Sequence, residues 1–323
     1  MPAARSCAVC GGSVILWARP CGDWSYDRCQ VCGHVELRQR PSREELQRYY
    51  DAIYEYSEER FAGAVARRYV KAVEDGAIHA LRRPRRILEV GCNTGVLLVA
   101  LRERGWQVAG TELSRRFRAV AHSRGLEVRT DLRDWIGEQF DIIVCFHVIE
   151  HMPDVNAELG AMRKLLRAPG VLAIKTPNAT CLAARLFPNE WEWSSPPAHL
   201  RLFTPASLRR SIEAAGFDVL RLATERGNAR PLPFQAMRAL AIRLRGRARR
   251  FTPGLDHRHV PIAHQLWYRS LEGIGGIVGA LGAPFAPVLR RLSLLPELTA
   301  FARISARAVD GTHHHHSKRE SAT

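Results

Sequence analysis

The chain has 323 residues, of which 46% are hydrophobic and 25% charged, and it carries a formal net charge of +16. These values exclude a disordered or fibrous chain and leave room for two compact units, or for one large domain with appendages. The excess of basic residues favours contact with phosphate, nucleic acid or an anionic membrane surface, although a preference for arginine codons would produce the same charge.

The sequence contains no segment typical of export or of membrane insertion. The N-terminus lacks an apolar signal region, and the longest uncharged run, Gly273–Leu289, is interrupted by two prolines and several glycines. A cytoplasmic protein is therefore expected, with peripheral contact at the inner membrane face as an open alternative. In that setting the eight cysteines are read as thiols or metal ligands rather than as disulfides.

Four of these cysteines form two matching C-x2-C pairs near the N-terminus. Each pair is followed by glycine, and about 18 residues separate the pairs, which are Cys7 with Cys10 and Cys29 with Cys32. This spacing is typical of a tetrahedral zinc site, and four thiolates leave no open coordination position. Short strand-like segments lie between the pairs, so we expect residues 1–40 to form a zinc ribbon with a structural Zn²⁺. Cys21 and His34 are read as non-ligands.

Residues 41–83 are predicted to be a helical linker or lid. Ser42 is the expected N-cap and Glu45, three residues later, its capping-box partner. The tyrosines at 49, 50, 54 and 56 are dense for a surface helix. They either pack on the next domain or cover a site.

From about residue 84, short β-rich segments alternate with amphipathic helical segments. The strand candidates include ILEV, WQVAGTEL, LEVRTDL, FDIIVCFHV and GVLAIKTP. This alternation predicts an α/β fold with a doubly wound parallel sheet, whose ligands bind beyond the carboxyl ends of the strands. That edge would bring together the 91–95 turn, Glu112, Asp131 and the 147–151 segment.

The turn after the first of these strands reads Glu89-Val-Gly91-Cys92-Asn93-Thr94-Gly95. It is neither G-x-G-x-x-G nor a P-loop, which disfavours a dinucleotide or ATP. The second strand ends at Glu112, whose two oxygens could accept both hydroxyls of a ribose. Asp131, after the third strand, could meet an adenine amino group, with Leu132 against the base.

Together, LEVGCNTG, TELS, FDIIVCFHVIEHMPD, LLRAPGVLAIKTPN and HLRLFTPASLRRSIEAAGFDVL resemble the class I S-adenosylmethionine-dependent methyltransferases. The resemblance covers about residues 84–225 plus a closing strand at LTAFARI, and it departs from the family at Asn93, where many members have glycine. It implies a Rossmann-like, seven-stranded sheet whose last strand is antiparallel. It also implies S-adenosylmethionine as cofactor, contacted by Glu89, Gly91, Cys92, Asn93, Gly95, Glu112, Leu113, Asp131, Leu132 and His147.

Two histidines are candidate catalytic residues. A hydroxyl or acidic carbon nucleophile has to lose its proton, and histidine is the usual base near neutral pH. His151 follows the fourth strand and His199 begins a segment after the Trp191–Trp193 cluster, so both could reach the transferred methyl group. Either histidine could equally have a structural role, ordering its own loop.

Residues 229–296 depart from a minimal methyltransferase. An arginine-rich amphipathic segment precedes a Gly/Pro-rich apolar one, a composition that fits either a helical cap or peripheral membrane contact through residues 236–295. We expect the methyltransferase core to comprise residues 84–228 and about 297–309, and residues 310–323, which include four consecutive histidines, to be a disordered tail.

Three functions remain open on the sequence alone. The first is methyl transfer to a small-molecule or lipid-linked acceptor such as a sugar, glycolipid or secondary metabolite. The N-terminal part resembles that of deoxysugar C-methyltransferases, but the chain lacks their large C-terminal domain, so oxygen is the favoured target. The second is ribosomal RNA methylation by a ribbon-bearing enzyme, which the charge favours and the absence of an aromatic–basic stacking face in the ribbon disfavours. The third is a non-catalytic binding module with a degenerate cofactor pocket. The sequence does not indicate an oligomeric state.

Overall fold

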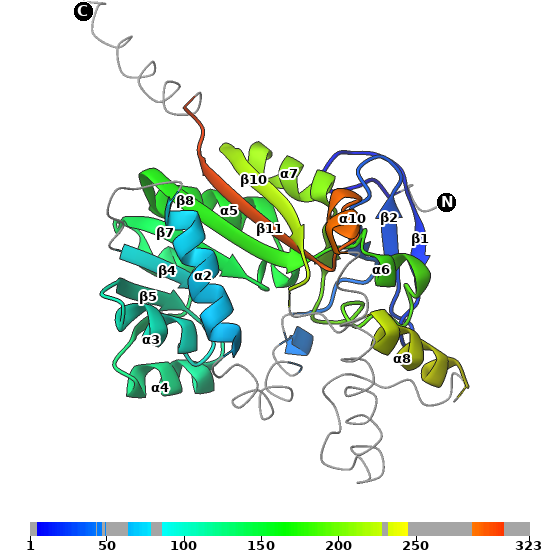
Figure 1. Ribbon diagram of the computed structural model, residues 1–323, viewed down its shortest axis with the longest axis horizontal. Coiled ribbons are helices and arrows are strands. Elements are labelled where there is room, and N and C mark those ends of the chain that lie inside the picture. The colour runs from blue at the N-terminus through cyan, green and yellow to red at the C-terminus, as the bar shows by residue number, and fades with distance from the viewer. Residues whose placement is uncertain are drawn as a thin grey trace, which may run out of the picture.

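The computed structural model describes residues 5–42, 44–46, 49, 64–78, 86–227, 232–244 and 286–306. The predictions for the tyrosines at 50, 54 and 56, for most of the 229–296 segment and for the tail fall outside these residues. Figure 1 shows a large sheet flanked by helices, with the N-terminal strands on one side of it.

The large sheet has seven strands in the order β10-β11-β8-β7-β4-β5-β6. Its strands are β4 (Arg86–Val90), β5 (Gln107–Thr111), β6 (Glu127–Arg129), β7 (Phe140–Phe146), β8 (Leu166–Pro177), β10 (Phe217–Glu225) and β11 (Glu297–Ile304). Six strands run in the same direction, and β11 lies antiparallel between β8 and β10. The expected seven-stranded, doubly wound sheet with an antiparallel last strand is confirmed.

Helices cover both faces of this sheet. They are α2 (Ala64–Ile78), α3 (Val96–Arg102), α4 (Arg115–Ser123), α5 (Val155–Leu165) and α7 (Pro205–Ala214), with two short 3₁₀ turns at Leu132–Trp135 and Ile149–His151. Because successive strand side chains point to opposite faces, Ile142 and Val144 of β7 pack in the cluster with α2 and α3. Ile143 and Cys145 pack in the other cluster, with α5 and α7.

The N-terminal residues form a second, four-stranded antiparallel sheet in the order β1-β2-β3-β9. Its strands are β1 (Val14–Ala18), β2 (Tyr26–Cys29), β3 (Val35–Leu37) and β9 (Arg201–Leu202). The fourth strand therefore comes from the middle of the methyltransferase-like segment, where Val35 pairs with Leu202. Three further helices, α6 (Leu182–Leu186), α8 (Leu232–Leu244) and α10 (Ala286–Arg291), lie near this sheet in Figure 1.

The structure contains the capping box that the sequence predicts at the start of the linker. Ser42 N–H donates to Glu45 Oε2 (2.7 Å) and Glu45 N–H to Ser42 Oγ (3.1 Å), which is the expected capping box. Among the described residues, no helix combines the length and the apolar character that crossing a membrane requires.

Candidate active site and four-cysteine centre

The turn between β4 and α3 depends on residues that tolerate left-handed backbone. Gly91 has φ 69°, and a Cβ there would lie 2.5 Å from Val148 Cγ2, so only glycine fits without displacing that side chain. Asn93 has φ 53°, a conformation that asparagine adopts more readily than most residues. Its Oδ1 accepts from Thr94 N–H (2.6 Å), a local hydrogen bond that favours asparagine at this position.

Glu112 fastens this turn to the end of β5. Its Oε2 accepts from Asn93 N–H (2.9 Å) and its Oε1 from Ser114 N–H (2.8 Å). Each carboxylate oxygen can accept a second hydrogen bond, so both remain able to meet a ribose hydroxyl. The residue predicted to hold the ribose also orders the loop that surrounds it.

Glu89 is a second buried carboxyl group in this pocket. It is 7% exposed, and within the described part of the chain its Oε2 has no hydrogen-bond partner. Burial, followed by the charge of Glu112, raises the pKa of Glu89 well above its ordinary value. A buried acceptor without a partner is costly, and a ligand that donates to it relieves that cost. The donor groups of S-adenosylmethionine fit this position.

The other predicted cofactor residues have different environments. Cys92 is buried, and its Sγ would lie 2.7 Å from a Cβ at residue 110, which explains glycine at that position. Leu113 is 63% exposed beside Glu112. Asp131 accepts from the Arg133 guanidinium (2.8 Å) and caps the following 3₁₀ turn, in which Leu132 is 3% exposed and packs in the main core. Contact of Asp131 and Leu132 with an adenine ring stays a prediction.

His147 follows β7 in a left-handed conformation, with φ 57°. Its Nδ1 lies 3.6 Å from Glu150 Oε1 and its Nε2 lies 3.5 Å from Glu297 Oε1. Burial alone would lower the pKa of His147, but these two carboxylates outweigh burial and raise it to about 9. The direction of this shift favours the protonated ring of His147 at neutral pH. Unusual backbone of this kind is often retained at functional sites.

His151 and His199 meet edge to face, with ring centroids 4.7 Å apart. His151 Nδ1 lies 3.0 Å from Ala198 O, and His199 Nδ1 lies 2.7 Å from Trp193 O. A carbonyl can only accept, so both rings carry their proton on Nδ1 and present Nε2 as an acceptor. Burial lowers the pKa of both rings, that of His199 to about 4 with a contribution from His151. We call this pair the histidine dyad.

Glu150 lies beside the dyad and is 0% exposed. Burial would raise its pKa, but the facing His147 outweighs burial and lowers the pKa to about 2. Thr176 Oγ1 donates to its Oε2 (2.9 Å). Glu150, His151 and His199 each offer one ligand atom within 4.8 Å of the others, so this trio could also hold a divalent metal ion.

Aromatic side chains stack on His147 and His199. Trp193 lies between His147 (5.4 Å, 19°) and His199 (5.7 Å, 13°), and Tyr69 of α2 stacks on the far side of His147 (6.3 Å, 24°). Sequence reasoning missed Tyr69 and Glu297. The periodicity of α2 marks Tyr69 only as an apolar position, and nothing in the sequence links Glu297, at the start of β11, to residues of β7.

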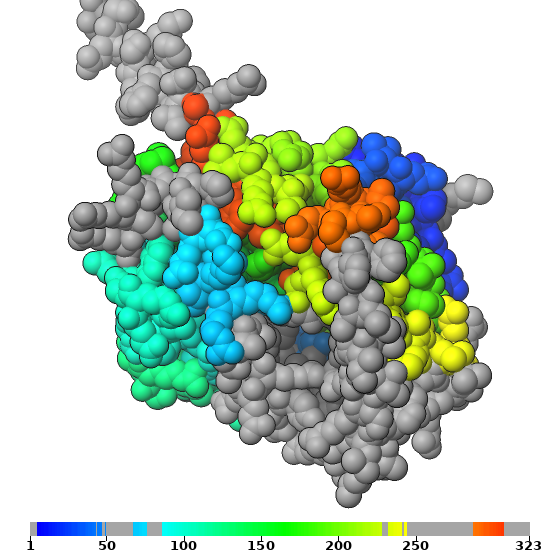
Figure 2. All heavy atoms as spheres, in the orientation of Figure 1, coloured from blue at the N-terminus to red at the C-terminus, as the bar shows by residue number. Residues whose placement is uncertain are grey.

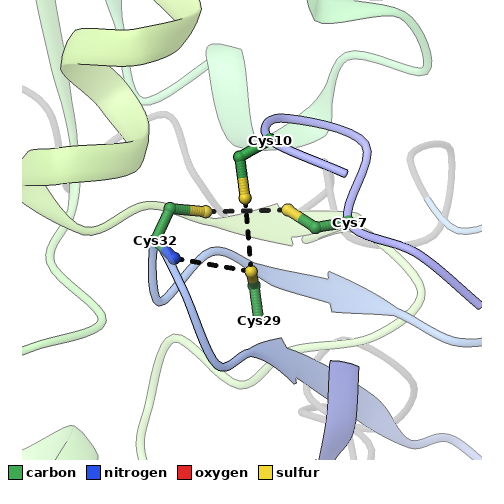
Figure 3. A group of neighbouring side chains, drawn as sticks. All are labelled: Cys7, Cys10, Cys29 and Cys32. Atoms are coloured by element: carbon green, nitrogen blue, oxygen red, sulfur yellow. Dashed lines mark hydrogen bonds between the residues drawn. The ribbon is translucent and has the colours of Figure 1, made fainter. Parts of the chain in front are cut away.

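The four predicted zinc ligands converge on one point, as Figure 3 shows. Sγ of Cys7 lies 3.6 Å from Sγ of Cys32, and Sγ of Cys10 lies 3.5 Å from Sγ of Cys29. Four thiolates bound tetrahedrally at 2.3 Å from zinc would lie about 3.8 Å apart, so the cluster has the size and donor set that a Zn²⁺ ion needs. Gly33, which follows the second pair, has φ 72° and permits the tight turn.

The two remaining candidates in the ribbon lie outside this cluster. His34 is 3% exposed with its ring 5.2 Å from that of Phe203. Cys21 is buried and is not among the grouped sulfurs. Both positions agree with their interpretation as non-ligands.

Comparison with known families matches residues 55–222, about half of the chain, to the family described as "Methyltransferase domain". The chain therefore belongs to this family of methyltransferase domains.

Curated relatives share this core. A ubiquinone biosynthesis O-methyltransferase of Aeromonas salmonicida is 30% identical over 151 residues, which are 42% of this chain and 63% of that protein. The protein of the same name from Xylella fastidiosa is 37% identical over 111 residues, 31% of this chain and 45% of its own length. The chain thus spans less than two thirds of the length of these relatives.

Among solved structures, a SAM dependent methyltransferase from Archaeoglobus fulgidus is 19% identical, with 77% of this chain and 99% of that chain covered and a TM-score of 0.46. The plantazolicin methyltransferase BamL is 11% identical, with 80% and 94% covered and a TM-score of 0.49. Neither likeness bears on the acceptor.

Proposed function

We propose that the protein transfers a methyl group from S-adenosylmethionine to a hydroxyl of a small-molecule or lipid-linked acceptor, with the histidine dyad as the proton acceptor. The observation that carries this proposal is the dyad itself. The His199 ring is buried and the His151 ring is half-buried, burial lowers the pKa of both, and each donates its Nδ1–H to a carbonyl, which makes Nε2 the basic atom. A nucleophilic hydroxyl needs such a base within hydrogen-bond reach.

The cofactor supplies an electrophilic methyl group on a sulfonium, so the protein mainly has to align a nucleophile with that carbon. In this proposal Glu89, Gly91, Cys92, Asn93 and Gly95 contact its methionine end. Glu112 holds the ribose, with Leu113, Asp131 and Leu132 at the adenine end. His147, as a fixed imidazolium, orders the floor of the pocket rather than accepting the substrate proton.

A hydroxyl acceptor is consistent with the relatives, whose printed names are O-methyltransferases. A lipid-linked acceptor is supported by exposed apolar and basic residues on and next to α6, α8 and α10; α8 (yellow) and α10 (orange) are both visible on the face shown in Figure 2. Leu186, Leu240, Val288 and Leu292 are each more than half exposed there, and Arg290 and Arg291 lie between the last two. Such a surface suits an anionic membrane interface. Binding to anionic but not zwitterionic vesicles, weakened by salt, would support this peripheral contact.

A structural zinc ion in the four-cysteine cluster is also part of the proposal. The ribbon gives less support to RNA as acceptor. Its exposed apolar residues are the aliphatic Ile15, Leu16 and Val31, whereas Trp17 and Trp24 pack against the buried cluster beneath. Base stacking needs exposed aromatic rings.

The test is transfer of labelled methyl from S-adenosylmethionine into a cell extract that is then separated into lipid, small-molecule and RNA pools. We expect label in the lipid or small-molecule pool. Label confined to RNA, or no S-adenosylmethionine binding by calorimetry, would overturn the proposal.

The same assay tests the base. His199→Gln or His151→Gln should lower kcat about 100-fold or more, because general-base catalysis contributes that much, and should leave cofactor affinity unchanged. His122→Gln, on the exposed side of α4, is the matched control and should keep full turnover. Full activity of both dyad variants would rule out the dyad as base.

A further inference from the structure

We propose that Tyr26, a residue of the cysteine-bearing ribbon, is a positioning residue for the histidine dyad, so that the ribbon is a working part of the active site. This inference rests on the proposed role of His151 and His199. It concerns a residue more than 120 positions away from either histidine in the sequence.

Tyr26 reaches from β2 directly to the backbone of the dyad. Its side chain is 0% exposed, and its hydroxyl donates to the carbonyl oxygen of His199 at 2.8 Å. The ring is fixed by an edge-on contact with Trp17, with centroids 6.4 Å apart. Burial holds the pKa of this hydroxyl well above its usual value, so it stays protonated and keeps donating.

The loop that Tyr26 holds carries the anchors of both histidines. The backbone N–H of His199 donates to Ser195 O (3.0 Å), and its ring is tied to Trp193 O within the same loop. The next carbonyl back, that of Ala198, is the acceptor for His151 Nδ1. The Tyr26 hydroxyl therefore fixes the backbone of His199. The adjacent carbonyl, that of Ala198, anchors the ring of His151, so one hydrogen bond influences both histidines.

The ribbon also forms hydrogen bonds with the residues that follow His199. Leu37 N–H donates to Leu200 O (2.8 Å), and β9 then completes the ribbon sheet. Thr204 Oγ1 donates to the carbonyl of Cys32, a member of the cysteine cluster, at 2.7 Å. On the other side, Leu200 N–H donates to the carbonyl of Glu150 (2.9 Å). The loop is thus clamped between the ribbon and the end of β7.

Removing the Tyr26 hydroxyl would leave the His199 carbonyl buried without its donor. Such a group seeks another partner, and here the peptide can rotate only by moving the attached imidazole. A displacement of this kind changes the alignment of the base with the acceptor more than it changes the distant cofactor pocket.

The test compares wild type with Tyr26→Phe, which deletes only the hydroxyl. We expect kcat to fall about tenfold, because misplacement of a catalytic group is costly, while the Kd for S-adenosylmethionine stays within about twofold. The direct readout is the imidazole ¹⁵N spectrum, with the His199 signals assigned by their loss in His199→Gln. Wild type should show the Nδ1-protonated form of His199, and Tyr26→Phe a mixture of both tautomers.

Asp27→Asn is the matched control. Asp27 is the neighbouring residue on β2, is 4% exposed and is bound to Arg38 (2.5 Å), so its variant perturbs the ribbon without touching the dyad loop. Asp27→Asn and Tyr26→Phe should both lower the melting temperature, but Asp27→Asn should keep the wild-type tautomer of His199 and the wild-type kcat. If Tyr26→Phe does not fold, site-specific replacement of Tyr26 by 4-fluorophenylalanine, which fills the space of the hydroxyl without donating a hydrogen bond, tests the same role: wild-type tautomer and kcat in that variant would overturn the inference.

Two outcomes separate this inference from the proposed function. A folded Tyr26→Phe with the wild-type tautomer and wild-type kcat overturns the positioning role, whatever the dyad does. If the dyad variants keep full turnover but Tyr26→Phe still changes the tautomer, the base assignment fails and the structural link stands. Equal losses of kcat in Tyr26→Phe and Asp27→Asn, with unchanged tautomers, would reduce Tyr26 to a stabilising residue and also overturn the inference.

Discussion

The buried ion pairs of His147 predict how the stability of the protein depends on pH. The perturbation is Glu297→Gln, which removes one of the two carboxylates that face the imidazole, keeps its size and leaves Glu150 in place. Glu297 Oε1 lies 3.5 Å from His147 Nε2, and the Glu297 side chain is 1% exposed. Solvent therefore screens this interaction little.

The magnitude follows from the pKa of His147. A rise from the ordinary value of 6.5 to about 9 corresponds to about 3 kcal/mol of preference for the charged ring in the folded protein. Burial opposes this shift, so the two carboxylates together contribute more than the net value, and removing Glu297 should lose at least half of it, about 1.5 kcal/mol or more.

The sign follows from the direction of the shift. The folded-state pKa lies above the unfolded one, so this stabilisation is fully present below pH 6.5 and is lost as the pH rises through about 9. Wild type and Glu297→Gln should therefore differ most at pH 6 and converge above pH 9. Urea unfolding at a series of pH values measures the difference.

The control is His147→Gln, alone and combined with Glu297→Gln. In the His147→Gln background, Glu297→Gln should no longer change the pH dependence between pH 6 and 10. A wild-type stability that is flat over that range, or a Glu297→Gln curve that runs parallel to it, would refute the assignment of His147 as a buried imidazolium.

Two further predictions concern the cofactor and the metal. Glu112→Gln should raise the Kd for S-adenosylmethionine about 10- to 100-fold in calorimetry, because an amide can supply only one of the two acceptor oxygens, whereas Glu127→Gln on the exposed part of β6 should not change it. Elemental analysis of the wild type should show one equivalent of zinc per chain. Cys29→Ser should lose this zinc and melt at a lower temperature, whereas Cys21→Ser should keep the zinc and the wild-type melting temperature. A melting temperature that chelators do not change would contradict a structural zinc site.

The features that could be predicted from the sequence are those with short-range signals. The prediction of a parallel sheet with helices on both faces rests on strand–helix alternation, and that of the turn at Gly91 rests on glycines whose conformation is required locally. The convergence of Cys7 and Cys29 rests on a spacing that has few other uses. In each case the pattern lies within a few tens of residues and reflects a single physical constraint.

The features that could not be predicted depend on tertiary packing. Glu297 precedes an apolar run at the start of β11, and only the antiparallel insertion of that strand beside β8 brings it to His147. Likewise, β9 has only two residues, too few to show the alternation of polar and apolar residues that marks a strand. Its pairing with the ribbon and the contact of Tyr26 with His199 therefore could not be predicted from the sequence.

The three histidines of the pocket divide into two kinds through the acceptors that surround them. His147 faces two carboxylates, which stabilise a charge and outweigh the cost of burying it, so its proton is held and is not available for exchange at neutral pH. His151 and His199 face backbone carbonyls at Nδ1, which fix the tautomer but supply too little negative charge to offset burial, so both rings stay neutral. A base must be unprotonated before it acts, so we propose the pair bound by carbonyls, rather than His147, as the proton acceptor.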